Sequence, residues 1–203
     1  PIYCSKPTLA LCKILLMDSA MLQQEDAQKI NEKKGDDNNP VTPLYTPQDV
    51  ENALKYFSAI DYDTAISING ALTCKLIRSG HILGAAFIVI TDGATTLTFS
   101  GDLGRPDQII MQDPPHIAQT DYLVLESTYG NRLHEKGDSL KMLKDIVLKT
   151  IQRKGVLIIP AFAVGRTQMI LYYLWLISKE MPQVPIYLDS PMAINVTDLY
   201  CDF

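Results

Sequence analysis

Histidine is scarce in this chain of 203 residues, which holds three histidines, one tryptophan and four cysteines. The cysteines are scattered and form no CxxC pair. This argues against a zinc knuckle or a disulfide framework and favours reduced, buried thiols. No apolar run approaches the roughly 20 residues that cross a bilayer, and no secretory leader is recognisable. We therefore expect a cytoplasmic protein without a membrane segment.

Positive charge is also in short supply. Eighteen lysines and arginines face 23 aspartates and glutamates, which leaves a net charge of -5. A chain-wide basic surface for nucleic acid is therefore excluded, whereas a local basic groove stays open. The hydrophobic fraction of 47% is typical of a soluble globular chain with one good core or two small ones.

The first 130 residues predict two helices followed by a run of strands. Residues 1–4 are typical of a strand, and 5–34 and 46–60 of amphipathic helices, the second with Thr46 as cap and Pro47 at its first position. Alternating polar and apolar residues then predict strands, with a hairpin signal at Asp92-Gly93, over 64–70, 71–80, 85–91, 95–100 and 121–128. The nearly continuous apolar run in the last of these predicts burial on both faces.

From about residue 131 the pattern changes to alternating helices and strands. Helices are predicted at 137–155, 165–181 and 191–200, and buried strands at 155–163 and 184–190. The middle helix is apolar around most of its surface, so we expect it to be buried. This alternation favours a parallel sheet with crossover helices. We therefore assign residues 1–130 and 131–203 to different structural units.

Two potential metal ligands flank a predicted hairpin. His81 lies at a loop-to-strand junction in "SGHILGAA", and Asp102 follows a strand in "FSGDLGRP". Because the chain goes out and returns between them, both side chains are expected at the same edge of a sheet. Imidazole and carboxylate are ligands that zinc and divalent first-row metals prefer. By spacing alone, a structural histidine and an ordinary Ser-Gly-Asp turn remain alternatives.

Four motifs occur in order along the chain: "SGHILGAA", "FSGDLGRP", "DYLVLESTYGNR" and "IPAFAVGRTQ". Together they resemble the β-CASP branch of the metallo-β-lactamase superfamily, nucleases that process RNA or DNA, and especially the RNA-processing type related to the polyadenylation cleavage endonuclease. The resemblance runs from residue 1 to about residue 200. It implies an α/β fold, with a partial αββα-type metallo-β-lactamase sandwich over 1–130 and the start of a β-CASP domain with a parallel sheet over 131–203.

The resemblance also implies a role for each motif residue. His81 is similar to the third-motif histidine, a metal ligand, and Asp102 to the fourth-motif aspartate that bridges two zinc ions. Glu126 is similar to the acid of the first motif special to the β-CASP branch, which orients a later histidine near the leaving group. The implied activity is zinc-dependent hydrolysis of phosphodiester bonds in single-stranded RNA, with Asp102 and Glu126 as catalytic residues.

The chain departs from the family pattern in one respect. It contains neither the HxHxDH motif, which supplies most metal ligands, nor the later β-CASP histidine motifs, so we expect an internal fragment of a longer enzyme that is inactive alone. His116 and His134 are predicted to be exposed and cannot substitute by position. Arg166 follows Gly165 at a strand-to-helix junction, where phosphate binding and ordinary capping are equally open.

Other functions remain as alternatives. The resemblance leaves open a DNA-acting nuclease, an endonuclease or an exonuclease, and a homodimer. A catalytically inactive scaffold subunit is disfavoured by the intact His81, Asp102 and Glu126. A hydrolase of small molecules is disfavoured because such members of the superfamily generally lack the insert that begins near residue 131.

Overall fold

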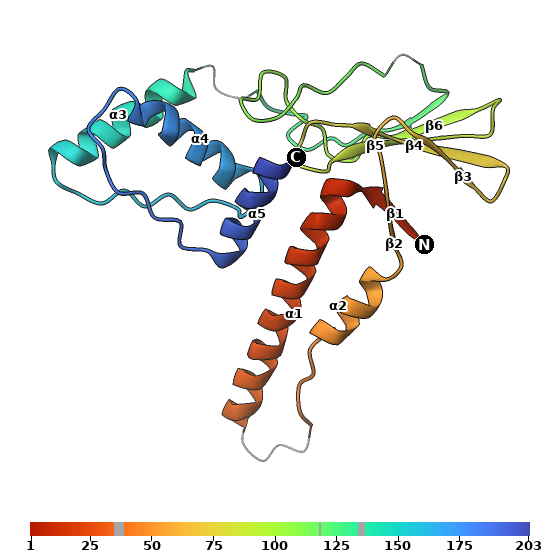
Figure 1. Cartoon of the computed structure of the whole chain (residues 1–203), viewed down its shortest axis with the longest axis horizontal. Coiled ribbons are helices and arrows are strands. Elements are labelled where there is room, and N and C mark those ends of the chain that lie inside the picture. The colour runs from red at the N-terminus through yellow and green to blue at the C-terminus, as the bar shows by residue number, and fades with distance from the viewer. Residues whose placement is uncertain (35–38, 118, 134–136) are drawn as a thin grey trace.

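A computed structural model of the chain describes residues 1–34, 39–117, 119–133 and 137–203. In Figure 1 the strands gather on one side and helices α3 to α5 on the other, with the long helix α1 running away from both. The helices are α1 (Lys6–Lys34), α2 (Pro47–Leu54), α3 (Ser139–Gln152), α4 (Arg166–Ser178) and α5 (Pro191–Asp202). The strands are β1 (Ile2–Ser5), β2 (Phe57–Ile60), β3 (Ala65–Ile68), β4 (Leu72–Arg78), β5 (Ala86–Thr91), β6 (Thr96–Phe99) and β7 (Tyr122–Val124).

The main sheet has the strand order β3-β4-β5-β6-β7. Neighbouring strands are antiparallel from β3 to β6, and β6 pairs with β7 in parallel. The predicted hairpin between β5 and β6 is confirmed: Asp92 Oδ1 accepts hydrogen bonds from the amides of Ala94 at 2.9 Å and Thr95 at 2.7 Å. Gly93 has a φ of 93°, the left-handed backbone that such a turn needs.

The start of α1 is fixed against the loop that follows β4. Ser5 Oγ accepts a hydrogen bond from the Thr8 amide at 3.2 Å, as expected of a helix cap. Both hydroxyl groups also donate to the Gly84 carbonyl, at 2.9 and 3.0 Å. A Cβ atom at Gly84 would lie 2.5 Å from Thr8 Oγ1, so only glycine allows this approach. None of the described helices is long and apolar enough to cross a membrane.

The second predicted helix is shorter than expected. The helix begins as predicted, with a capping box between Thr46 and Asp49, but α2 ends at Leu54. Extending it to residue 60 was wrong, because residues 57–60 form β2 and pair in parallel with β1. Sheet pairing with a distant strand prevails over the local helical pattern.

The predicted burial of β7 was also wrong. Tyr122, Leu123 and Val124 are 65%, 52% and 51% exposed. The strand is the edge of the main sheet, and among the described elements its extensive contacts are with β6 alone. A continuous apolar run therefore does not imply burial when nothing described covers the strand.

The α/β fold class is confirmed for the chain as a whole, and all three helices predicted after residue 131 are present. The strands predicted at 155–163 and 184–190 are absent, so the parallel sheet expected there does not form. Val156 and Ile158, for example, are 82% and 83% exposed. Expecting α4 to be buried was also only partly right, since Trp175 is 51% exposed. A strand needs a hydrogen-bonded neighbour, and the described residues supply none to these segments. The division near residue 130 stays a prediction.

Candidate metal and catalytic site

Three strands of the main sheet end at the same edge. Because β4 and β6 both run antiparallel to β5, and β7 runs parallel to β6, the carboxyl ends of β4, β6 and β7 lie together. His81 follows β4, Asp102 follows β6 and Glu126 follows β7. Strand direction thus collects the three predicted side chains on adjoining loops.

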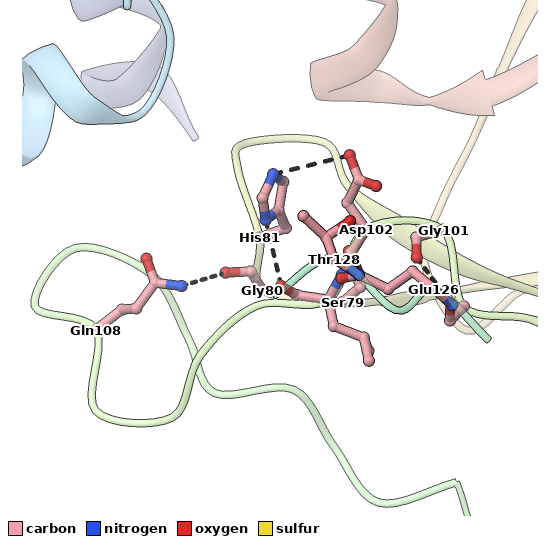
Figure 2. A network of polar contacts seen from close by, with 10 residues as sticks. Ser79, Gly80, His81, Gly101, Asp102, Gln108, Glu126 and Thr128 are labelled. Carbon is pink, nitrogen blue, oxygen red and sulfur yellow. Dashed lines mark hydrogen bonds and ion pairs between the residues drawn. The ribbon is translucent and has the colours of Figure 1, made fainter. Parts of the chain in front are cut away.

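The geometry confirms that these side chains lie side by side (Figure 2). His81 Nε2 lies 3.8 Å from Asp102 Oδ2, and the side chains are 42% and 71% exposed. Glu126 Oε1 accepts a hydrogen bond of 2.7 Å from the Leu103 amide, the residue directly after Asp102. The arrangement is a solvent-facing cluster and no part of the apolar core. The roles assigned to these residues stay predictions.

Two buried serines, which the sequence reasoning missed, hold the loops in place. Ser79 is 0% exposed, and its hydroxyl donates to the Asp102 carbonyl at 2.9 Å. Ser100 is 1% exposed, and its hydroxyl oxygen accepts from the Glu126 amide at 3.0 Å. The sequence contains a pattern that points to these serines, since the dipeptide Ser-Gly precedes both His81 and Asp102.

The loop before His81 and the loop after Asp102 also touch through glycine. The Gly104 amide donates to the Ser79 carbonyl at 2.8 Å. A Cβ atom at Gly104 would lie 2.3 Å from the carbonyl carbon and 2.4 Å from the carbonyl oxygen of Gly80. No real Cβ contact is this short, so the two backbones can meet only where residue 104 has no side chain.

We expect Gly104→Ala to lower the free energy of unfolding by about 1–3 kcal/mol, because the methyl group would meet backbone atoms that cannot rotate away. Denaturant unfolding measures this value. Gly137→Ala is the matched control, since among the described residues a Cβ there would meet Met142 Sδ alone, at an ordinary 3.5 Å. Equal stability of the two variants would contradict the close approach at Gly104.

The ring of His81 contacts the loop that carries Asp102. Its Nδ1 lies 3.2 Å from the Leu103 carbonyl oxygen. Because a carbonyl only accepts hydrogen bonds, Nδ1 of the neutral ring carries the proton and Nε2 keeps its lone pair. A metal-binding histidine has its other nitrogen bound in this way. The pair fits a metal site as two of its ligands, although the described residues contain no cluster of three or more histidine, cysteine, aspartate or glutamate side chains suited to a metal.

Glu126 is held as a carboxylate. The hydrogen bond from the Leu103 amide is the largest cause that lowers the pKa of Glu126, and Thr128 and the nearby His81 act in the same direction. Because hydrogen bonds to the charged form favour it, Glu126 is ionised at neutral pH. In the described residues this side chain orients the loop that carries Asp102.

The start of α4 packs behind the histidine loop. A Cβ at Gly165 would lie 2.9 Å from Ile82 Cγ2, and the Leu83 amide donates to the Tyr200 hydroxyl of α5 at 3.2 Å. Burial raises the pKa of Tyr200 above its usual range. Residues at the start of α4 and in α5 thus contact the loop that carries His81.

The amino terminus of α4 is occupied by its own side chains. Gln168 Oε1 accepts from the Gly165 amide at 2.7 Å, and its amide group donates to the Ala163 carbonyl at 3.0 Å and to Thr197 Oγ1 at 2.9 Å. Of the two alternatives for this helix end, capping and phosphate binding, these contacts support capping of the backbone amides. The Arg166 side chain is exposed and has no ion pair within the described part of the chain, so it remains available to a phosphate.

The other candidate ligands stand apart from the site. His116 is exposed, as predicted, and His134 lies outside the described residues. All four cysteines are free thiols. Burial of thiols is confirmed for Cys4 and Cys74, whereas Cys201 is exposed. Burial raises the pKa of Cys4 and Cys74.

The main sheet thus presents an imidazole and a carboxylate together at one exposed edge, and both are side chains of the kinds that bind zinc. The chain is 35% identical to ribonuclease TTHA0252 of Thermus thermophilus over 201 residues, 98% of this chain and 42% of the relative. It is 32% identical to cleavage and polyadenylation specificity factor 73 of Drosophila melanogaster, over 77% of this chain and 24% of that protein. No family model matches.

A solved structure shares the fold. A protein of unknown function from Enterococcus faecalis superposes with a TM-score of 0.50 at 13% identity, over 98% of this chain and 43% of the other. Over nearly its whole length the chain is homologous to these relatives, which are RNA-processing nucleases of the β-CASP metallo-β-lactamase type. It spans less than half the length of each of these relatives. Homology to metallo-β-lactamase-type nucleases implies dependence on a metal in general terms.

Proposed function

We propose that the whole protein containing this chain is a metal-dependent nuclease that hydrolyses phosphodiester bonds in single-stranded RNA. The observation that carries the proposal is the exposed pair of His81 Nε2 and Asp102 Oδ2, 3.8 Å apart. The relatives support RNA as the substrate, since one bears the name ribonuclease and another that of a cleavage and polyadenylation factor. The proposed compartment is the cytoplasm.

In this proposal each of four residues of the chain has its own role. His81 and Asp102 would hold metal, and an imidazole nitrogen with a carboxylate oxygen suits zinc. A bound metal pair supplies Lewis-acid polarisation of the scissile phosphate and a nucleophile at neutral pH. Glu126 keeps the Asp102 loop in position through the Leu103 amide. Arg166 offers an exposed positive charge to a backbone phosphate.

Full-length protein incubated with labelled single-stranded RNA should cleave it, and a chelator should stop the cleavage. A DNA oligonucleotide of the same sequence is the control for substrate class. Cleavage that resists the chelator would show that the metal mechanism is wrong. Cleavage of DNA alone would indicate a DNA-acting nuclease, and inactivity on both substrates would favour a scaffold. Product lengths separate an endonuclease from an exonuclease.

The 203-residue chain alone should bind no stable pair of zinc ions. Among the described residues, His81 and Asp102 are the two side chains assigned as metal ligands, whereas a zinc ion in a protein takes at least about three protein ligands. After dialysis against a weak chelator, metal analysis should find well below about one zinc ion per chain. A stoichiometric pair of zinc ions would overturn this ligand assignment, and full-length protein treated in the same way is the control.

A further inference from the structure

An arginine and a tyrosine form an exposed pair in the segment that follows Glu126. Tyr129 follows Glu126 by three residues and is 59% exposed. The guanidinium carbon of Arg132 lies 5.2 Å from the centre of the Tyr129 ring, within the range of a cation–π contact. A large aromatic ring thus lies at the surface three residues along the chain from Glu126, with a positive charge against it.

The backbone at Tyr129 is unusual. Its φ of 57° lies in the left-handed region, which bulky residues rarely adopt. The tight turn around it is closed by a hydrogen bond of 2.9 Å from the Gly130 amide to the Ser127 carbonyl, and by one of 3.1 Å from the Arg132 amide to the Tyr129 carbonyl. Asparagine or glycine would form this turn with less strain. Strained residues of this kind cluster at functional sites.

We propose that Tyr129 and Arg132 form a nucleotide subsite next to His81 and Asp102. The exposed ring of Tyr129 stacks on one base of single-stranded RNA, and the Arg132 guanidinium contacts a backbone phosphate. This inference rests on the proposed function and adds residues that bind the substrate. Its chemistry is general: aromatic rings with arginines bind single strands through stacking and charge, without reading sequence.

A second aromatic and cationic pair serves as the internal control. Lys179 Nζ lies 3.4 Å from the centre of the Trp175 ring, and Trp175 is 51% exposed. The pair lies at the end of α4, in regular helix and outside the loops that carry His81, Asp102 and Glu126. It offers similar chemistry without the position next to the site.

The test measures dissociation constants by fluorescence anisotropy, using full-length protein, labelled single-stranded RNA and a chelator that keeps the RNA intact. A parallel set of RNAs carries one abasic nucleotide, moved stepwise along the strand. Tyr129→Asn removes the ring and suits the left-handed backbone, so the fold is retained. Tyr129→Phe keeps the ring, Arg132→Met removes the charge, and Trp175→Leu is the matched control.

Stacking on one base is worth roughly 1–3 kcal/mol, so Tyr129→Asn should weaken binding roughly 5- to 150-fold. Tyr129→Phe should bind within about twofold of wild type, because it keeps the ring face. One abasic position should weaken wild type as much as Tyr129→Asn does, and should leave Tyr129→Asn unaffected. Arg132→Met should make the binding constant less dependent on salt concentration, by the amount expected for losing about one phosphate contact. Trp175→Leu should respond to the abasic position as wild type does.

If Tyr129→Asn binds RNA as tightly as wild type, the subsite is overturned. The same holds if Trp175→Leu, and not Tyr129→Asn, becomes insensitive to the abasic position. Cleavage of RNA by wild type, assayed on the same preparation with metal, reports separately on the proposed function. Wild type that cleaves RNA while Tyr129→Asn binds normally overturns the subsite and leaves the nuclease intact. Wild type that neither binds nor cleaves RNA overturns both.

Discussion

Asp102→Ala in the full-length protein should abolish cleavage of single-stranded RNA. The Asp102 carboxylate lies 3.8 Å from His81 Nε2, and the two are the proposed metal ligands among the described residues at this edge of the sheet. If it bridges two ions, as the family resemblance implies, its removal disturbs both at once. We expect the rate to fall by at least about 10²–10⁴-fold, the range for losing a positioned catalytic group.

The measurement is the single-turnover rate of cleavage of a labelled oligonucleotide. Asp145→Ala is the matched control, because Asp145 is an exposed aspartate on α3, away from the three site loops. The melting temperature of both variants shows whether the fold is retained. Full activity of Asp102→Ala would remove Asp102 from the site.

Glu126→Gln should reduce the same rate less than Asp102→Ala does. Glutamine keeps an oxygen that can accept the hydrogen bond from the Leu103 amide, so the Asp102 loop should stay in place. The substitution removes the negative charge, which the resemblance assigns to orienting a later histidine near the leaving group. We expect a loss of roughly 10²–10⁴-fold in kcat, with KM little changed.

The pH profile of kcat separates this role from a structural one, since losing an oriented acid–histidine pair changes the profile and a looser loop does not. Glu51→Gln on α2 is the matched control, because Glu51 is exposed and its hydrogen-bond partner within the described residues is Gln48 of the same helix. An unchanged rate and profile for Glu126→Gln would refute the positioning role. An equal loss of activity in Glu51→Gln would show that the effect does not depend on the position of Glu126.

Interactions between near neighbours were determined by the sequence alone. The capping box of Thr46 and Asp49 spans three residues, and the Asp92 turn closes within the same span. Ser190 caps α5 by accepting a hydrogen bond of 3.2 Å from the Ala193 amide. Such contacts depend on residues only a few positions apart, so patterns of residue types predict them.

The juxtaposition of His81 and Asp102 was also predictable. A hairpin separates them, and a hairpin returns the chain to the edge from which it left. Adding the strand before Glu126 requires only that it run parallel to β6, which the structure confirms. The family motifs pointed to the same three residues. Their ligand and catalytic roles remain for the experiments above.

Pairing and burial, in contrast, were decided only by the tertiary structure. Residues 57–60 have a helical pattern, yet they form β2 because β1 offers hydrogen bonds along its edge. Apolar segments such as 155–163 have the composition of a buried strand, but the described residues supply no neighbour to pair with or cover them. The contact of Gly104 with Gly80 likewise joins two loops more than 20 residues apart. Such contacts depend on partners far away in the chain, and local propensity carries no information about where those partners will lie.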